Sequence, residues 1–351
     1  LKSNFDGESM RNLFKKITFL STCVFLSTSI FAAKSPVALI IAQGGLGDAS
    51  WNDTAHKGFK SGLNSTGLKG KAIESNDVVA QGEELMRRAA DSGFGLIVSL
   101  EYSHGESMEK LAPSYNDSKF VILNQVRKGS NVVSILFSEH EGSYLAGALA
   151  AQVTTDTSIP GINSDAVIGV IGGFKSPGID KFLAGYAEGA KAVNSNIKVL
   201  MAYSNSFGDP AKGEQMAQAM FEQGADIVYQ VAGGTGIGII EAAKKAGKYA
   251  IGVDTDQDGM APGHVLTSMM KRVDVAVDDV IKQHANGSLR GGNTLNYGLV
   301  ENGVALSEMK HTRNKIPSKY IQRVEKMKKD IISGKIKVWD VTQQGYPSYM
   351  N

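Results

Sequence analysis

Short apolar runs alternate with amphipathic segments from Pro36 onward, and a Gly- or Asp-rich turn joins most of them. Runs of Val, Ile and Leu that are apolar throughout are typical of parallel strands covered on both faces. The expected strands are Val37–Ala42, Leu96–Leu100, Phe120–Leu123, Val167–Ile171, Lys198–Tyr203, Ile227–Val231 and Tyr249–Val253. The expected helices, with apolar residues at three- and four-residue spacing, are Asp53–Leu63, Gln81–Asp91, Gly142–Val153, Gly178–Val193, Pro210–Gln223 and Gly236–Ala246. This alternation predicts an α/β fold with doubly wound parallel sheets.

The number of strand–helix units exceeds what one sheet needs, and 351 residues suffice for two domains of ordinary size. We expect a first lobe made of residues 34–140 and 258–290, and a second lobe made of residues 141–257 and 291–351. Further elements are predicted near the end: a helix at Val273–Ala285, a strand at Asn293–Val300 and a basic amphipathic helix at Ser318–Ser333. The lysines of this last helix are interpreted as a solvated face and not as a partner site. Because no low-complexity linker separates the halves, several short crossovers should join the lobes.

Residues 1–33 have the features of an export signal. Met10 to Lys16 form a positively charged segment, Ile17 to Phe31 are mostly apolar, and Ala32-Ala33 offers a small-residue cleavage site. Residues 1–9 are interpreted as extra residues upstream of the start at Met10. The single cysteine, Cys23, either carries a lipid anchor or is an ordinary residue of the apolar segment. The sequence therefore predicts an exported periplasmic or cell-surface protein, with a lipid anchor as its one means of membrane attachment.

Composition argues against several classes of function. The formal net charge is only +2, and there is no basic stripe with interleaved aromatic residues, so nucleic-acid binding is not expected. The six histidines show no metal-ligand spacing, and there is no G-x-S-x-G segment. We expect no metal, no cofactor and no catalytic residue.

Two aromatic residues stand in polar loops that directly follow predicted strands. Trp51 lies in Gly47-Asp-Ala-Ser-Trp51-Asn-Asp53, and Phe207 lies in Ser204-Asn-Ser-Phe207-Gly-Asp-Pro210. The simpler interpretation is a capped helix start with the aromatic ring packed over it. The alternative is that the two rings, one from each lobe, hold a flat ligand between them.

A glycine-rich turn, Val231-Ala-Gly-Gly234-Thr-Gly-Ile-Gly238, follows a predicted strand and opens a helix. Asp254 lies 20 residues beyond Gly234, the separation found in dinucleotide sites. The glycines, however, are spaced G-x-G-x-G, and the export signal argues against a bound NAD. The turn can still offer backbone N–H groups to a ligand oxygen.

Three alternating carboxylates, Asp254, Asp256 and Asp258, follow the apolar run Tyr249–Val253. They match the first half of a calcium loop, but Val265 stands where the loop requires a bidentate Glu. Carboxylates at the carboxyl end of a strand are instead well placed to accept hydrogen bonds from a polar ligand. Ser268-Met-Met-Lys271 has the spacing of an acylating serine enzyme, but the partner motifs of such enzymes are missing from the sequence.

Together these segments resemble the basic membrane protein family, whose best-understood type is the purine nucleoside receptor lipoprotein of spirochaetes. The resemblance covers about Pro36 to Val341. The segments that carry it are Gly47–Asp53, Glu141–Ala151, Phe207–Gly213, Gly234–Gly236, Ile251–Gln257 and Met270–Asp274. Members of this family are receptors of ABC transporters, so the resemblance implies a type I periplasmic-binding-protein fold with two lobes around a ligand cleft.

The resemblance also implies a ligand site in which two aromatic rings hold a purine and carboxylates bind the ribose hydroxyls. The matching positions are Trp51 (where Phe is commoner) and Phe207 for the rings, Asp256 for a ribose carboxylate, Asp48 and Asn52 for polar contacts of the first loop, Gly234 for a backbone contact and Lys271 for a charged contact. Asp254 and Asp258 are interpreted as turn and crossover residues.

One position departs from the family pattern. The family usually places Asp after the strand Phe120–Leu123, whereas this chain has Asn124, whose amide donates as well as accepts hydrogen bonds. We expect a monomeric extracytoplasmic receptor that binds a nucleoside, preferably a purine nucleoside, and delivers it to an ABC permease. The alternatives are the same fold binding a sugar, a flavin or another small signal molecule, and an exported serine enzyme that uses Ser268 and Lys271.

Overall fold

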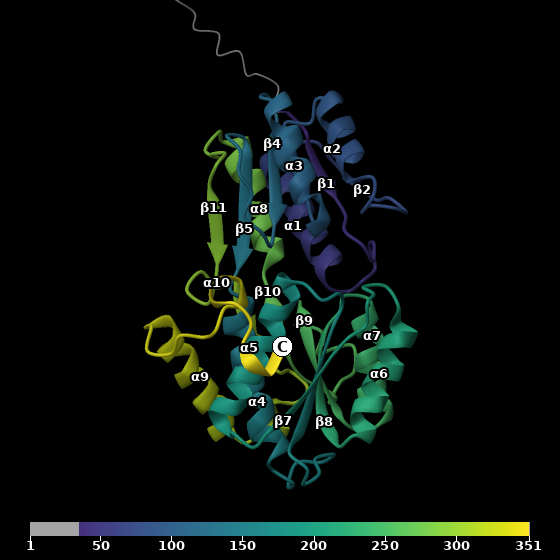
Figure 1. The fold of residues 1–351 in the computed structure, drawn as a ribbon, viewed down its shortest axis with the longest axis vertical. Coiled ribbons are helices and arrows are strands. Elements are labelled where there is room, and N and C mark those ends of the chain that lie inside the picture. Colours follow the sequence, from purple (N-terminus) through teal and green to yellow (C-terminus); the bar gives the residue numbers. More distant parts are fainter. Residues whose placement is uncertain (1–34, 351) are drawn as a thin grey trace, which may run out of the picture. The chain divides into compact units, whose positions relative to one another are not determined.

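Two six-stranded sheets organise residues 35–350, the part of the chain that the computed structural model describes (Figure 1). The first sheet has the order β11-β5-β4-β3-β1-β2 and is parallel throughout. Its strands are β1 (Val37–Ile40), β2 (Gly70–Ile73), β3 (Leu96–Ser99), β4 (Lys119–Leu123), β5 (Val132–Phe137) and β11 (Thr294–Tyr297). The predicted export signal and Cys23 lie outside the described residues.

The second sheet has the order β12-β10-β9-β8-β6-β7, and only β12 runs antiparallel to its neighbour. Its strands are β6 (Val167–Gly172), β7 (Lys198–Tyr203), β8 (Ala225–Val231), β9 (Tyr249–Asp254), β10 (Val265–Lys271) and β12 (Val304–Leu306).

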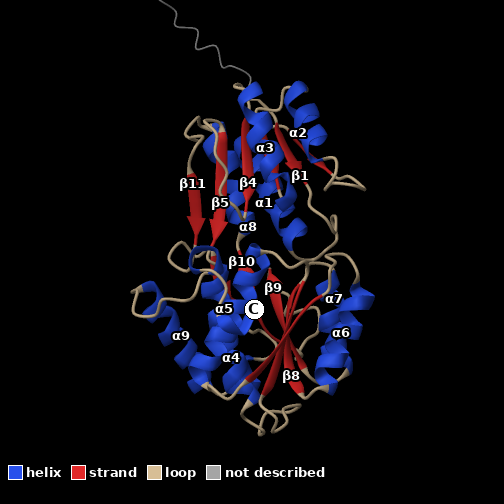
Figure 2. Ribbon diagram, in the orientation of Figure 1, coloured by secondary structure: helices blue, strands red, loops and turns tan. Residues whose placement is uncertain are grey.

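Helices cover both faces of each sheet (Figure 2). In the first lobe these are α1 (Trp51–Thr66), α2 (Gly82–Asp91), α3 (Gly105–Leu111) and α8 (Val273–Ala285). In the second lobe they are α4 (Glu139–Thr154), α5 (Pro177–Val193), α6 (Pro210–Glu222), α7 (Thr235–Lys245), α9 (Ser318–Ile332) and α10 (Val341–Gln344). Short 3₁₀ turns occur at Tyr102–His104, Ala112–Ser114, Arg313–Lys315 and Ser348–Met350. No helix in residues 35–350 has the length and apolar character needed to span a bilayer.

The uniformly apolar strands follow from this two-sided cover. In β1, Val37 and Leu39 pack in one core with Phe59 of α1, while Ala38 and Ile40 pack on the opposite face with Met86 of α2. Successive side chains of a strand point to opposite faces, so both sets must be apolar when both faces are buried. The predicted α/β fold with doubly wound sheets is confirmed.

The chain passes between the lobes three times: from β5 to α4, from β10 to α8 and from β11 to β12. The first lobe therefore contains residues 35–137 and 273–297, and the second contains residues 139–271 and 304–350. The boundaries expected at residues 257/258 and 290/291 differ from this arrangement. The loop after Asp254 returns to the same sheet, because β10 pairs with β9, and β11 pairs with β5 of the first sheet.

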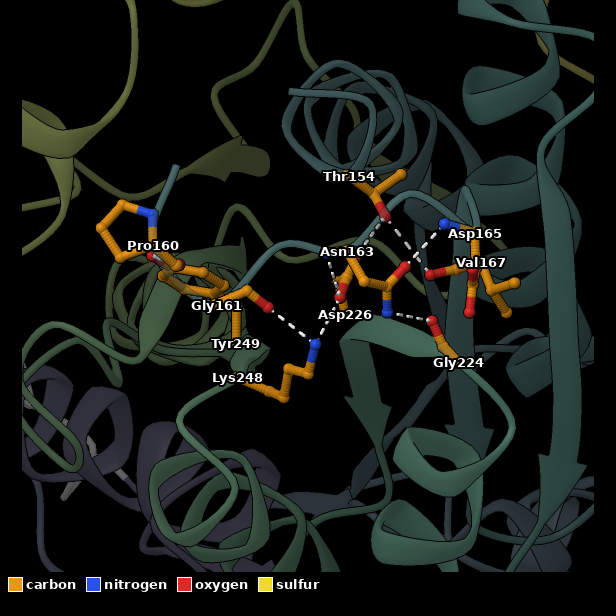
Figure 3. Close-up of polar contacts among 10 residues, drawn as sticks. All are labelled: Thr154, Pro160, Gly161, Asn163, Asp165, Val167, Gly224, Asp226, Lys248 and Tyr249. Atoms are coloured by element: carbon orange, nitrogen blue, oxygen red, sulfur yellow. Dashed lines mark hydrogen bonds and ion pairs between the residues drawn. The ribbon is translucent and has the colours of Figure 1, made fainter. Parts of the chain in front are cut away.

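A buried polar cluster fixes the end of the second lobe where its strands begin (Figure 3). Asp226 of β8 is fully buried, and its carboxylate accepts hydrogen bonds from Thr154 Oγ1 at 2.9 Å and from Lys248 Nζ at 2.6 Å. The backbone N–H of Asn163 also donates to this carboxylate. Asp226 thus joins α4, the loop before β6 and the segment before β9.

Replacing Asp226 by Asn should lower the free energy of unfolding by about 2 kcal/mol, because the amide removes the charge partner of Lys248 and cannot accept all the donors. Chemical denaturation measures this value. Asp165→Asn is the matched control, because Asp165 lies in the loop before β6, beside the cluster, but is exposed. Equal stabilities of the two variants would contradict the anchoring role of Asp226.

Candidate functional site

A cavity of about 280 Å³ lies between the two lobes. Its lining comes from the segments at the carboxyl ends of β1, β3 and β4 in the first lobe and of β6 to β10 in the second. Ligands of open α/β sheets bind at these ends. The volume is close to the lower limit of about 300 Å³ for small-molecule sites, so the cavity suits a small ligand.

Aromatic rings from both lobes line the cavity. Trp51 begins α1 of the first lobe, and Phe207 lies in the loop after β7 of the second. A third ring, Phe174, packs against Phe207 with ring centroids 5.5 Å apart. A Cβ atom at position 173 would lie 2.1 Å from the Phe207 ring, so only glycine leaves room for the ring there.

Lys271 ends β10 and is the cation of the cavity wall. Its Nζ lies 2.8 Å from Asn124 Oδ1 and 2.8 Å from Glu139 Oε1, and 4.5 Å from the centroid of the Trp51 ring. An ammonium group only donates hydrogen bonds, so the oxygen of the Asn124 amide faces Lys271. The NH₂ group of Asn124 is then left as a donor for other partners.

Glu139 connects Lys271 to a second buried cation. Its other carboxylate oxygen lies 2.7 Å from Nζ of Lys181, which also donates to the Phe137 carbonyl. Burial alone would raise the pKa of Glu139, but the two ammonium groups outweigh burial and lower the pKa to about 2. Glu139 therefore stays ionised and offsets part of the positive charge beside the cavity.

Asp254 is the acidic residue of the cavity wall at the end of β9. Its backbone is left-handed, with φ of 66°, and its carboxylate accepts a 2.5 Å hydrogen bond from the hydroxyl of Ser50 in the first lobe. Burial raises the pKa of Asp254 to about 6, although Lys271 and the Ser50 hydroxyl act in the opposite direction. At neutral pH the group is mostly ionised, which suits it to accept hydrogen bonds from a ligand.

Asp48 and Asn52 shape the first loop of the site. The Asp48 carboxylate accepts backbone N–H groups of Ser50, Asn52 and Asp53, and so caps the start of α1. Asn52 is fully buried and bonds the backbone of Ala42 and Gln43. Asp48 lines the cavity, whereas Asn52 supports its wall from behind.

Asp256 and Gly234 lie next to the cavity but are absent from its lining. Asp256 forms an ion pair with Lys310 at 3.1 Å, and 28% of its side chain is exposed. Gly234 lies beside the Phe207 carbonyl, and its neighbour Gly233 lines the cavity instead. Of the residues predicted for the site, the structure brings Asp48, Trp51, Asn124, Phe207 and Lys271 together around the cavity.

The carboxylates at and after the end of β9 form hydrogen bonds or ion pairs within the protein. Asp258 accepts hydrogen bonds from Ser268 Oγ, Ser307 Oγ and the Lys310 backbone, and Asp254 points to Ser50. The three carboxylates thus point to different partners, and no group of His, Cys, Asp and Glu that could hold a metal occurs among residues 35–350. The Ser268 hydroxyl is fully buried and bonded to Asp258, and Ser268 does not line the cavity.

Glu101 is a cavity residue that sequence reasoning missed. It directly follows the strand Leu96–Leu100, the same signal that identified other site residues. Its carboxylate accepts hydrogen bonds from the Gln43 backbone N–H at 3.1 Å and from Ser103 Oγ at 3.0 Å. Glu101 therefore ties the loop after β3 to the loop after β1.

The chain is similar to known proteins over most of its length. Residues 35–342 match the family described as ABC transporter substrate-binding protein PnrA-like. The ABC transporter nucleoside-binding protein BmpA of Lactococcus lactis is 34% identical, with 86% of this chain and 88% of that protein covered. Basic membrane protein A of Borreliella burgdorferi is 32% identical, with 81% and 84% covered.

A solved structure of an ABC transporter solute-binding protein has a similar fold. The crystal structure of an ABC transporter solute-binding protein from Aeropyrum pernix has a TM-score of 0.79 at 28% sequence identity, and the match covers 87% of this chain and 93% of that chain. The two sheets with interleaved helices and the cavity between them correspond to the type I fold of periplasmic binding proteins.

Proposed function

Because the chain belongs to the family of PnrA-like ABC transporter substrate-binding proteins, we propose that its cavity binds a nucleoside, preferably a purine nucleoside. The chain is the extracytoplasmic receptor of an ABC transport system, a role that requires a small-molecule ligand and a permease partner. Members of this family are receptors rather than enzymes. The proposal takes the receptor to be a monomer that delivers the ligand to a permease.

The observation that carries the proposal is the pair of aromatic rings, Trp51 and Phe207, which reach one cavity from different lobes. A purine is a flat aromatic ring, and such a ring gains from stacking on both of its faces. The 34% identity to a relative named as a nucleoside-binding protein supports the same conclusion.

We assign the ribose hydroxyls to Asp254 rather than to Asp256. Asp254 is buried in the cavity wall and has an oxygen free of the Ser50 hydrogen bond, whereas Asp256 is paired with Lys310. A carboxylate can accept hydrogen bonds from two neighbouring hydroxyls. The NH₂ group of Asn124 and the Lys271 ammonium supply donors to the same ligand.

The charges around the cavity disfavour nucleotides. Among residues 35–350, three carboxylates (Asp48, Glu101 and Asp254) and one cation (Lys271) line it, and Lys271 is already paired with Glu139. An adjoining polar space of about 820 Å³ contains Glu74 and Asp77 among its described lining residues, and no Lys or Arg. A phosphate brought into this surrounding would meet net repulsion, so an uncharged nucleoside should bind better than its monophosphate.

Trp51 provides a direct test of nucleoside binding. The sequence has only two tryptophans, so Trp339→Phe leaves Trp51 as the one tryptophan reporter. We expect purine nucleosides to change the Trp51 emission saturably and to raise the melting temperature, because the base would stack on this ring. Calorimetry on the unsubstituted protein gives the affinity.

The ligands compared should be adenosine, guanosine, inosine, pyrimidine nucleosides, free bases, ribose, riboflavin and nucleoside monophosphates. Nucleosides should bind more tightly than the free base or ribose alone, since the purine ring and the ribose hydroxyls both contribute to the affinity. Saturable binding of ribose or riboflavin together with no response to any nucleoside would refute the proposal. Lipid attachment at Cys23 stays a prediction that mass spectrometry of the mature N-terminus checks.

A further inference from the structure

Positive charge is concentrated in one segment of the second lobe. Residues 308–337 contain ten Lys and Arg against three Asp and Glu. Residues 35–307 and 338–351 together contain 22 Lys and Arg against 30 Asp and Glu. A chain with a net charge of only +2 therefore combines a strongly basic segment with an acidic remainder.

The basic side chains of this segment lie in solvent. Arg313, Lys319, Arg323 and Lys329 are all exposed, and within residues 35–350 none of them forms an ion pair or a side-chain hydrogen bond. Lys326 and Lys335 share the single carboxylate of Asp330, and their side chains remain 75% and 74% exposed. We call the exposed cations of residues 310–337 the basic face.

The helix α9 holds most of the basic face in place. It buries Val324, Met327 and Ile331 in the core of the second lobe and packs against α4. Figure 1 shows α9 on the side of the second sheet opposite α6 and α7. Its basic side chains are therefore carried by a rigid element, and an apolar residue, Ile332, is 44% exposed among them.

We propose that the basic face docks on the anionic lipid headgroups of the membrane at which the receptor meets its permease. Clusters of four to eight Lys and Arg on an amphipathic helix bind anionic lipid surfaces, and about 1 kcal/mol is gained per residue near the surface. Because the apolar face of α9 is buried in the second lobe, the contact would be electrostatic, with Ile332 as a single exposed apolar side chain beside it.

Orientation follows from the same charges. An anionic surface attracts the basic face and repels the acidic remainder, so the receptor should approach the membrane with α9 foremost. The cavity is lined by neither α9 nor any other residue of 308–337, so docking leaves the ligand site free. The inference is therefore independent of the ligand that the cavity holds.

Vesicle co-sedimentation tests this inference. Residues 35–351 are the suitable protein, because they form a compact unit with both sheets, and the apolar segment Ile17–Phe31 would itself partition into lipid. The protein should bind vesicles containing phosphatidylglycerol and not vesicles of phosphatidylcholine alone. Raising the salt from about 0.05 M to about 0.5 M should release it.

Two variants locate the binding surface. Replacing Arg313, Lys319, Arg323 and Lys329 by Gln should lower the vesicle partition coefficient at least about tenfold. The matched control replaces the same number of exposed first-lobe lysines by Gln, at Lys60, Lys69, Lys71 and Lys110. This control should bind within about twofold of the unsubstituted protein, although its net charge has changed equally.

Several outcomes would overturn the proposal. They are no binding of the unsubstituted protein to anionic vesicles at low salt, equal losses in both variants, and binding only to vesicles that carry an added membrane protein. The last outcome would assign the basic face to an acidic protein partner. Thermal unfolding and the Trp51 response to nucleosides should be unchanged in both variants, which separates a failure of docking from a failure of nucleoside binding.

Discussion

Replacing Asp254 by Asn is expected to weaken nucleoside binding by about 100-fold. The carboxylate lies buried in the cavity wall, and a charged acceptor that bonds two ligand hydroxyls contributes about 1.5–3 kcal/mol per bond. The loss of about 3 kcal/mol corresponds to two factors of ten in the dissociation constant. Calorimetry on the purified variant, with inosine and adenosine, measures the change.

Asp256→Asn is the matched control for this prediction. Asp256 lies two positions further along the same loop but is paired with Lys310 near the surface. The affinity of the Asp256→Asn variant for nucleosides should stay within about twofold of that of the unsubstituted protein. The opposite pattern, a large loss in Asp256→Asn and none in Asp254→Asn, would return the ribose role to Asp256.

Asp254→Asn should weaken binding without lowering the free energy of unfolding of the unliganded protein. Burial raises the pKa of Asp254 from its usual 3.8 to about 6 in the folded protein, so ionising this group costs folding free energy. Between about pH 4 and pH 6 the folded state binds more protons than the unfolded state, and the contribution of Asp254 to stability decreases as the pH rises. Asp254→Asn removes this decrease, so the unliganded variant should be at least as stable as the unsubstituted protein at pH 7.

The same pKa predicts a pH dependence of binding. A protonated carboxyl accepts hydrogen bonds less well, so affinity should be constant above about pH 7 and fall as the pH passes below 6. Asp254→Asn should flatten this profile. A profile of unchanged shape in the variant would mean that another group controls the pH response.

Much of the fold follows from the sequence because both faces of most strands are buried. Runs such as Val37–Ile40 and Ile227–Val231 are apolar at every position or nearly so, and this pattern is readable from a single sequence. The strand β2 was missed because it is an edge strand whose residues, including Lys71, are partly exposed. The strand β10 was missed because Thr267, Ser268 and Lys271 interrupt its apolar pattern, and the lobe boundary expected at residues 257/258 was displaced as a result.

The sequence predicts those cavity residues that directly follow strands. It does not predict contacts between side chains that are far apart in the sequence. Trp51 and Phe207 stand directly after strands, which is sufficient to place them at the ligand edge of a sheet. The choice between Asp254 and Asp256 depends on the left-handed turn at Asp254 and on Lys310, which local pattern does not reveal. The contact between Asn124 and Lys271 joins residues 147 positions apart, so it required the structure.

Replacing Glu139 by Gln should have the largest effect on stability, a loss of about 3–5 kcal/mol in the free energy of unfolding. Glu139 is 2% exposed and is the carboxylate between two buried ammonium groups, at 2.8 Å from Lys271 and 2.7 Å from Lys181. An amide of the same shape removes the ion pair of both ammonium groups, which are less than a tenth exposed. Urea denaturation at pH 7 measures the loss.

Glu141→Gln is the control for this substitution. Glu141 lies in the same first turn of α4, but burial raises its pKa, and its carboxylate accepts the backbone N–H of Leu299 rather than a lysine. Neutralising it should cost about 1 kcal/mol or less, since a neutral amide can accept the same hydrogen bond. A loss in Glu141→Gln as large as that in Glu139→Gln would point to the start of α4, rather than to the two ion pairs, as the cause.

The pH dependence of the Glu139→Gln effect separates charge from packing. The pKa of Glu139 is about 2 in the folded protein, below its usual value of 4.5, so its contribution to stability is fully present above about pH 4.5 and disappears as the pH falls through 2. The difference in stability between the unsubstituted protein and the variant should therefore be constant from pH 7 to pH 5 and narrow towards pH 2. A difference that stays the same at every pH would assign the loss to packing of the side chain, because packing does not depend on protonation.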